Sequence, residues 1–184
     1  MNERKQKLRE ARLSVRRNRA VPASMSWTPV LREALSALAP GARTVALYWP
    51  IRGEPDPGDF ARALASEGVT VALPVCGPAR TMDFRRWDPS TGKPTERDAA
   101  GIPAPVSGEA VAPDALIVPC VGWSAGGRRI GYGGGYYDRW IEGRGGVLIG
   151  IGFMEDRIDD AEDLFEAFDL LLQGIATDAG FVRF

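Results

Sequence analysis

A glycine-rich segment has the residue types and spacing best suited to chemistry. The run GGRRIGYGGGYYDRW occupies residues 126–140, with glycines at 131, 133, 134 and 135 and two arginines, Arg128 and Arg129. Glycines let backbone N–H groups approach an anion closely, and arginines add fixed positive charge. The segment therefore predicts a phosphate-binding loop, although it matches neither G-x-x-x-x-G-K-[ST] nor G-x-G-x-x-G. The alternative is a glycine-rich turn that serves only the path of the chain.

The composition limits the available chemistry, because the sequence contains no histidine. Ser-His-Asp catalysis and zinc sites that need imidazole are excluded, so a reaction must depend on carboxylates, Lys, Arg, Tyr, Cys or backbone groups. Two cysteines, Cys76 and Cys120, have no C-x-x-C spacing and cannot build a disulfide framework, which favours a reducing cytoplasm. The sequence has no apolar run of membrane-spanning length and no signal-peptide pattern, so we expect no membrane association.

Positive charge is concentrated at the start of the chain. The 184 residues have a net charge of −1, but residues 1–20 contain eight Lys and Arg against two Glu, which is +6 and leaves −7 for the remainder. Such a segment suits nucleic acid, a membrane surface or a phosphorylated ligand, or it is the solvated face of a helix. The acidic remainder and the lack of an RNA-recognition motif make nucleic acid an unfavoured partner.

The elements that must position the glycine-rich segment alternate between helices and strands. Helices are expected over residues 3–19, from Ser26 or Thr28 to the Pro40-Gly41 break, and over 59–67 and 136–142. Strands are expected at 44–49, 69–75, 81–87, 114–121, 146–152 and 170–176. We therefore expect one α/β domain over residues 1–184, with a mostly parallel sheet preceded by two helices.

This pattern places the glycine-rich segment after a buried strand, at the carboxyl edge of the sheet, where ligands bind in open α/β folds. The helix that follows would present its positive end to the same place. Residues 76–113 are rich in Pro and Gly and suit a lid or binding loop better than a core. Cys120, within a strand of buried type, is interpreted as a small hydrophobe.

Four stretches resemble a known enzyme family in order and spacing. The run RRIGYGGGYYDR, residues 128–139, closely resembles the R-L-G-x-G-x-G-Y-Y-D signature of the 5-formyltetrahydrofolate cyclo-ligases, also called methenyltetrahydrofolate synthetases. Lys5 and Arg9 match that family's K-x-x-x-R, YWPIRGE at 48–54 resembles its folate-contacting stretch, and residues 116–121 resemble its apolar strand. The resemblance spans nearly the whole chain. It implies a three-layer α/β sandwich of the sugar-phosphate isomerase and CoA-transferase type.

The resemblance also implies an activity. Enzymes of this family use ATP and Mg²⁺ to convert 5-formyltetrahydrofolate to 5,10-methenyltetrahydrofolate, releasing ADP and phosphate. ATP phosphorylates the formyl oxygen, the folate N10 attacks the activated carbon, and phosphate leaves as the ring closes. Phosphoryl transfer depends on charge stabilisation more than on a proton-shuttling side chain, so a protein without histidine can perform it. The partners implied are ATP and a reduced folate, with a monomer expected.

The roles that the resemblance implies fall into four overlapping groups. The nucleotide-binding residues are Lys5, Arg9, Arg129, Gly131, Gly133, Gly134, Gly135, Tyr136 and Tyr137. The substrate-binding residues are Trp49, Glu54, Tyr132, Gly133, Gly134, Gly135 and Tyr136. Arg129, Tyr136 and Asp138 are the catalytic candidates, and Asp138 and Asp169 are the Mg²⁺ ligands. Mg²⁺ prefers one or two carboxylates completed by phosphate oxygens and water, which suits so small a set.

Several of these residues also have an alternative explanation that is purely structural. A Trp at the end of a strand, such as Trp49, is more often core than the wall of a ligand site. Asp138 could instead be a capping residue and Asp169 a surface charge. Met82, Phe84 and Trp87 are further candidates for the folate pocket, with plain packing as the alternative.

Four residues at three places depart from the family pattern. Trp123-Ser124 replaces Phe-Asp before the glycine-rich segment, Phe168 replaces a histidine, and Gln173 replaces an aspartate. The first alternative is therefore a related protein that binds nucleotide or folate with little turnover. The second is an RNA-binding module that uses the basic first helix.

Overall fold

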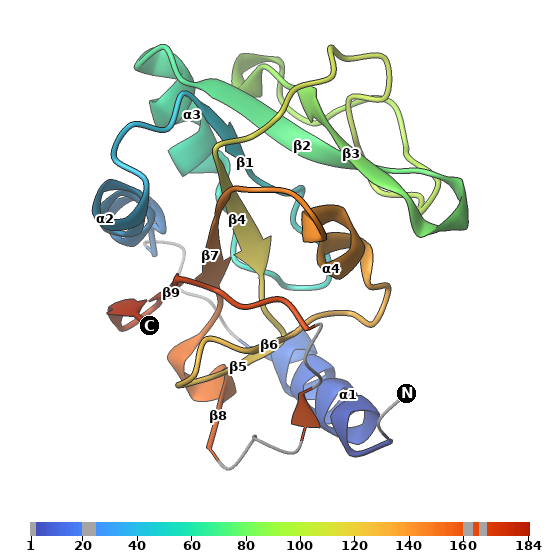
Figure 1. Ribbon diagram of the computed structural model, residues 1–184, viewed down its shortest axis with the longest axis vertical. Helices are drawn as coiled ribbons and strands as arrows, with labels where there is room; N and C mark the ends of the chain where they lie inside the picture. The colour runs from blue at the N-terminus through green and yellow to red at the C-terminus, as the bar shows by residue number, and fades with distance from the viewer. Residues whose placement is uncertain (1–2, 20–24, 160–163, 166–168) are drawn as a thin grey trace.

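The computed structural model describes residues 3–19, 25–159, 164–165 and 169–184. Its centre is a seven-stranded sheet with the strand order β10-β9-β7-β4-β1-β2-β3 (Figure 1). The strands are β1 (Thr44–Ala46), β2 (Thr70–Cys76), β3 (Met82–Arg86), β4 (Ala115–Pro119), β7 (Val147–Ile151), β9 (Gly174–Thr177) and β10 (Gly180–Arg183). The five strands from β9 to β2 are parallel, and the edge strands β10 and β3 are antiparallel. The mostly parallel sheet is therefore confirmed.

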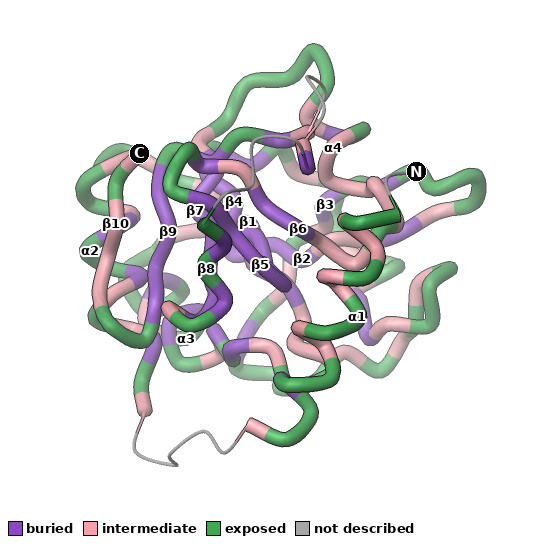
Figure 2. The backbone as a smooth tube through the Cα atoms, turned by 90° about the horizontal axis from the view of Figure 1, so that it is seen from below, coloured by how far each residue is buried: buried purple, intermediate pink, exposed green. Residues whose placement is uncertain are grey.

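Helices cover both faces of this sheet. The helices α2 (Thr28–Leu38) and α3 (Gly58–Ser66) pack on one face, where Leu31 and Phe60 are fully buried. The short helix α4 (Tyr136–Ile141) covers the other face, where Trp140 packs edge-on against Phe84 at 4.9 Å between ring centroids. All five residues of β4 are buried, as expected for a strand covered on both sides (Figure 2). The α/β sandwich predicted from the sequence is confirmed.

A second, three-stranded sheet lies beyond the carboxyl ends of the central strands, with α1 (Glu3–Arg17) beside it (Figure 1). Its strand order is β6-β5-β8, with bounds β5 (Gly122–Ser124), β6 (Arg129–Ile130) and β8 (Arg157–Ile158). Short 3-10 turns η1 (Pro78–Arg80), η2 (Pro89–Thr91) and η3 (Met154–Asp156) complete the structure. This sheet was not predicted, because strands of two or three residues are too short to show a hydrophobic period.

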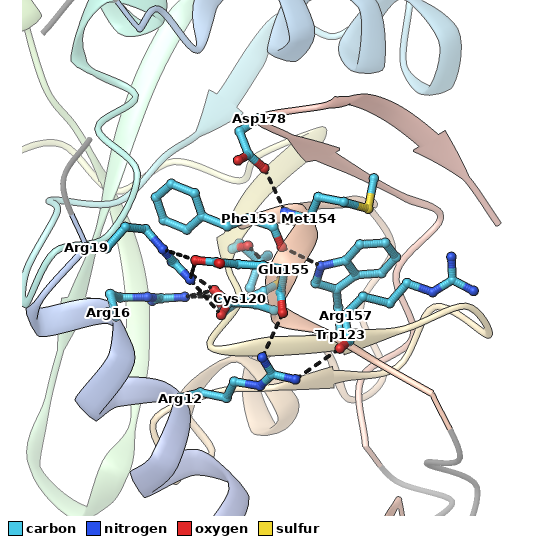
Figure 3. Close-up of polar contacts among 12 residues, drawn as sticks. Arg12, Arg16, Arg19, Cys120, Trp123, Phe153, Met154, Glu155, Arg157 and Asp178 are labelled. Atoms are coloured by element: carbon cyan, nitrogen blue, oxygen red, sulfur yellow. Dashed lines mark hydrogen bonds and ion pairs between the residues drawn. The ribbon is translucent and has the colours of Figure 1, made fainter. Parts of the chain in front are cut away.

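Arginines from α1 and the residues just after it attach this helix to the rest of the protein (Figure 3). Arg16 Nη2 lies 3.1 Å from Asp156 Oδ2 and donates to the Cys120 carbonyl at 2.6 Å, and both charged side chains are fully buried. Arg19 donates to Asp156 Oδ1 at 3.0 Å. Arg12 donates at 2.7 Å to the carbonyl of Glu155. Much of the basic segment therefore binds the protein itself.

Several element boundaries differ from the predicted ones. β1 ends at Ala46. The next residues of the same apolar run, 47–49, are not part of the strand but contribute to the core and to the cavity wall. The predicted strand 170–176 overlaps β9 only from residue 174. The Gln173 N–H still donates to the Leu148 carbonyl at 2.9 Å, but the Leu148 N–H donates to the Gln173 side chain at 2.6 Å, and Leu171 bridges to Arg128 instead of joining the central sheet. β10 was not predicted. Phe168 lies outside the described residues.

No helix within the described ranges has both the length and the apolar character needed to cross a membrane.

Candidate active site

A cavity of about 870 Å³ opens at the carboxyl ends of β1, β2 and β4. The chain passes from β1 to β2 on one side of the sheet centre, whereas β4 and β7 lie on the other side. The cavity thus lies at a topological switch point, where open α/β sheets bind ligands. Trp49 after β1, Cys76 at the end of β2 and Pro119 at the end of β4 contribute to its wall. Its size suits a cofactor or a similar small molecule.

The structure brings together the whole set of residues predicted for the site. Those lining the cavity are Lys5, Arg9, Trp49, Glu54, Arg129, Gly131, Tyr132, Gly133, Gly134, Gly135, Tyr136, Tyr137, Asp138 and Asp169. Arg128 does not line it and instead donates to the Asp169 carbonyl at 2.6 Å. Of the further candidates, Met82 lines the cavity, whereas Phe84 is core and Trp87 packs edge-on against Trp49 at 6.0 Å. The individual roles stay predictions.

The glycine-rich segment needs its glycines for conformation. Gly133 and Gly135 have φ angles of +88° and +64°, in the left-handed region that favours glycine. A Cβ at Gly133 would lie 3.2 Å from the Arg9 guanidinium, and one at Gly134 would lie 2.8 Å from the Tyr136 ring. The N-terminus of α4 lies at the cavity wall as expected, because both its N-cap Gly135 and its first residue Tyr136 line the cavity. A helix end carries at most about half a charge, so the arginines are the main cationic groups.

Arg129 is a buried cation whose hydrogen-bonding capacity is not used up. Its side chain is 6% exposed, and Nη1 donates to the Pro119 carbonyl at the long distance of 3.5 Å. Nη2 lies 3.8 Å from Asp138 Oδ2, and the guanidinium lies 5.3 Å from the centre of the Tyr137 ring. Nε has no hydrogen-bond partner among the described residues. Because a buried unpaired donor is costly, this arrangement suits an anion bound in the cavity.

Two carboxylates lie together beside this arginine. Asp138 Oδ1 accepts the Leu170 N–H at 3.1 Å, so it contacts the backbone next to Asp169. Asp169 Oδ2 lies 2.6 Å from Lys5 Nζ, and its side chain is 12% exposed, so the surface-charge alternative is wrong. The described residues contain no cluster of three metal-binding side chains. Two carboxylates near a phosphate-type cradle nevertheless fit Mg²⁺, which completes its octahedron with phosphate oxygens and water.

The first helix turns two cations toward the cavity. Lys5 pairs with Asp169, and Arg9 Nε donates to the Gly131 carbonyl at 2.7 Å. Their spacing of four residues places them on one helix face, as the sequence indicates. Together with Arg129 they surround the glycine-rich segment with positive charge.

Glu54 lies on a tight turn that also lines the cavity, near Tyr132 of the glycine-rich segment. Arg52 and Gly53 are both left-handed, with φ of 52° and 74°, and the Ile51 N–H donates to Glu54 Oε2 at 2.8 Å. Burial raises the pKa of Glu54 to about 7, although this N–H and the nearby Tyr132 hydroxyl favour the ionised form. Burial also raises the pKa of Tyr132. Glu54 therefore changes its charge near neutral pH.

Replacing Glu54 with glutamine is expected to stabilise the protein at alkaline pH. The native state binds the Glu54 proton more tightly than the unfolded state, whose pKa is near 4.5, so stability falls as pH rises from that value through about 7. Glutamine keeps the acceptor for the Ile51 N–H and removes the charge. Urea unfolding should show no advantage at pH 4 and a gain of up to about 3 kcal/mol above pH 8. A gain that does not change with pH would contradict the buried carboxylate.

Sequence reasoning missed several residues that line the cavity: Arg52, Cys76, Asp98, Pro119, Arg139 and Glu142. Arg52 and Arg139 lie inside the two recognised motifs, so their neighbours could have drawn attention to them. Asp98 gave no signal, because its role depends on a contact across 22 residues. Its Oδ2 accepts the Cys76 N–H at 3.0 Å, and Oδ1 accepts the Ile102 N–H at 3.0 Å, which fixes the loop against β2.

The model of the 5-formyltetrahydrofolate cyclo-ligase family matches residues 1–160. The chain belongs to this family. Its membership makes the protein an enzyme of the cyclo-ligase type. The matched residues include the whole glycine-rich segment as well as Lys5, Arg9 and Glu54, and only Asp169 among the predicted site residues lies beyond them.

Individual relatives agree with the family assignment. The 5-formyltetrahydrofolate cyclo-ligase of Mycolicibacterium smegmatis is 31% identical over 147 residues, covering 74% of each chain. The 5-formyltetrahydrofolate cyclo-ligase of Haemophilus influenzae is 32% identical over 108 residues, covering 55% of this chain and 57% of the relative.

Solved structures show the same fold. The 5,10-methenyltetrahydrofolate synthetase of Aquifex aeolicus superposes with a TM-score of 0.78 at 26% identity, covering 97% of this chain and 92% of the other. The synthetase from Mycoplasma pneumoniae has a TM-score of 0.71 at 23% identity, covering 95% and 98%, and supports the fold alone.

Proposed function

We propose that the protein catalyses the ATP- and Mg²⁺-dependent conversion of 5-formyltetrahydrofolate to 5,10-methenyltetrahydrofolate, with ADP and phosphate as the other products. The observation that carries this proposal is the single cavity that joins a buried, incompletely paired Arg129 and two carboxylates to a glycine-rich cradle. Family membership and the named relatives support the same reaction.

The two substrates would occupy different parts of the cavity. The triphosphate of ATP lies on residues 131–135 between Lys5, Arg9 and Arg129, and the folate lies toward Trp49 and Glu54. Asp138 and Asp169 would hold Mg²⁺, which would supply charge neutralisation at the phosphate oxygens. Lys5 then exchanges part of its pairing with Asp169 for phosphate.

This placement would bring together the groups that react in the conversion proposed above. The formyl oxygen attacks the γ-phosphorus while the bond to ADP breaks, and Arg129 stabilises the charge on the transferred group. The folate N10 then attacks the formyl carbon and loses its proton. The C–O bond breaks, and phosphate carries the former formyl oxygen away. Tyr132 and Tyr136 border the cavity where the two substrates meet and exclude water from it.

A binding protein with little turnover is the first alternative, and the positions of two departures from the family pattern count against it. Ser124 is buried in β5 and does not line the cavity, and neither does Gln173. An absorbance assay with purified protein, 5-formyltetrahydrofolate, ATP and Mg²⁺ distinguishes the enzyme from the binding protein. Appearance of the methenyl product supports the enzyme, whereas calorimetric binding of ADP or folate without product supports the alternative.

Replacing Arg9 with glutamine is expected to raise the KM for ATP by about tenfold, because charge-assisted hydrogen bonds contribute about 1.5–3 kcal/mol. Arg17 lies exposed on the same helix and outside the cavity, so Arg17→Gln is the matched control and should leave this KM unchanged. The RNA-binding alternative predicts instead that both variants weaken a salt-dependent RNA affinity similarly. Equal effects of the two variants on the KM for ATP would contradict the nucleotide role of Arg9.

Replacing Asp138 with asparagine is expected to reduce Mg²⁺ affinity and turnover by at least about 10–100-fold. The amide keeps an oxygen for the Leu170 N–H, so the thermal midpoint should stay close to that of the wild type. Activity titrated against Mg²⁺ measures the effect, and Asp83→Asn on the exposed side of β3 serves as the control. Unchanged turnover and metal dependence would remove the metal role from Asp138.

The proposal includes a monomeric enzyme of the reducing cytoplasm. Cys76 and Cys120 are both free and buried, which is compatible with that compartment.

A further inference from the structure

Arg16 has an arrangement that stability alone does not explain. Its guanidinium is fully buried, and Nη2 makes both of its hydrogen bonds, to Asp156 and to the Cys120 carbonyl. Nε and Nη1 are buried without a hydrogen-bond partner among the described residues. An unpaired buried donor costs free energy, and apolar residues of similar volume often replace a buried ion pair without loss of stability. The retained cation therefore points to a task beyond holding α1.

The groups next to Arg16 belong to the folate side of the cavity. A Cβ on Gly53 would lie 3.3 Å from Arg16 Cγ, so the turn that carries Glu54 rests directly on the arginine. The Tyr132 hydroxyl is buried and makes no hydrogen bond of normal geometry in the described structure, although it lies close enough to Glu54 and Arg16 to interact with both. Glu54 and Tyr132 line the cavity, whereas Arg16 and Asp156 do not. Arg16 thus lies behind the cavity wall. It is bonded to the buried Asp156 carboxylate and is close to Glu54 and Tyr132, the two polar groups that line the cavity.

We propose that Arg16 is a positioning residue of the active site, fixed by Asp156 and the Cys120 carbonyl so that its two remaining donors orient Tyr132 and Glu54 toward the bound folate. The inference rests on the proposed function. Active-site hydrogen bonds are often loose before substrate binds and tighten in the complex, which agrees with a Tyr132 hydroxyl that makes no hydrogen bond of normal geometry.

The positioning matters because of what a pterin ring offers. Its 2-amino group and neighbouring ring N–H are two donors side by side, and an ionised carboxylate can accept from both, whereas a protonated one gives up an acceptor. The charge of Arg16 lowers the pKa of Glu54 and that of Tyr132, opposing the effect of burial. Arg16 therefore favours the form of Glu54 that recognises the pterin.

Other groups also face Glu54. Arg52, on the same turn, lowers its pKa, and the hydroxyls of Tyr48, Tyr132 and Tyr137 interact with it electrostatically. These residues stay in place in the variants below, so the comparison isolates the Arg16–Asp156 pair.

The test removes the cation without leaving an unpaired charge. In Arg16→Met/Asp156→Leu both members of the ion pair become apolar, which protects the fold. The Glu54→Gln substitution is made in this background and in the wild type, and urea unfolding is followed from pH 5 to pH 9. We expect the alkaline stabilisation by Glu54→Gln to be larger in the double variant, by about tenfold in the unfolding equilibrium constant for a pKa one unit higher. Identical increments in the two backgrounds would overturn the proposal.

Arg19→Met is the matched control, because Arg19 also bonds Asp156 but lacks the contact with the Glu54 turn. Arg19→Met should lower the free energy of unfolding. The alkaline stabilisation that Glu54→Gln produces should be the same in this background as in the wild type. An increment enlarged as much as in the Arg16 variant would overturn the proposal, because it would trace the effect to a loosened helix.

Kinetics supply the second readout. With Glu54 one pKa unit higher, its ionised fraction at pH 7 falls about fivefold, so the KM for 5-formyltetrahydrofolate should rise about fivefold. The KM for ATP should stay constant, and the difference should disappear near pH 9. A rise in both KM values that persists at pH 9 would contradict the assigned role. If the wild-type protein shows no turnover, the proposed function fails, while the unfolding experiment still decides whether Arg16 acts on Glu54.

Discussion

Replacing Arg129 with methionine is expected to lower kcat by about 10³-fold, the low end of what an arginine at a transferring phosphoryl group contributes. Methionine keeps a flexible apolar side chain over the Tyr137 ring but removes the charge. The loss should fall mainly on kcat, because charge on the transferred group is largest in the transition state. Single-turnover kinetics with saturating ATP and folate measure it directly.

Two further substitutions make the Arg129 experiment specific. Arg129→Lys keeps the charge but loses the planar set of donors, so it should recover only part of the rate. Arg144→Met removes an arginine that donates to the Trp140 carbonyl outside the cavity and should leave kcat unchanged. A kcat of Arg129→Met within tenfold of the wild type would exclude Arg129 from the chemical step.

Replacing Asp156 with asparagine is expected to destabilise the protein by about 3–5 kcal/mol, because it leaves Arg16 buried with no opposite charge. Arg19 would lose the same partner. Urea unfolding at pH 7 measures the change, with the slope of the transition checked for two-state behaviour.

The Asp156 prediction has an internal check. Arg16→Met/Asp156→Leu should recover most of the lost stability, because no buried charge then lacks a partner. A loss below about 1 kcal/mol in Asp156→Asn would mean that the ion pair is open to solvent, contrary to its full burial.

The sequence was sufficient to predict which residues come together around the cavity, for a simple physical reason. Residues at the ends of parallel strands meet at one sheet edge, so Trp49 after β1 and the glycine-rich segment after β4 had to come together once the strands were recognised. The motif around Gly131–Gly135 then indicated which ligand the cavity would bind, because such a segment suits a phosphate group. The prediction that residues 76–113 contribute to binding is consistent with Asp98 and Ile102 in the cavity wall.

The parts that could not be predicted depend on contacts between distant residues. Arg16 looks in the sequence like one more cation on a solvated helix face, and only its contact with Asp156, 140 residues away, makes it the best-buried charge of α1. The same holds for the short strands β5, β6 and β8, which exist because the chain brings them together. Phe84 was a pocket candidate only because strand alternation cannot tell a cavity wall from the core.

The docking of α1 has a consequence for how the enzyme is made. This helix is synthesised well before its partners, which are Cys120, Gly131, Asp156 and Asp169. Contacts of such long sequence separation form slowly and cannot form before those residues have left the ribosome. This side of the cavity is thus completed only after Asp169 has been translated, and a nascent chain that stops short of Asp156 would carry Lys5 and Arg9 on a helix without a docking surface.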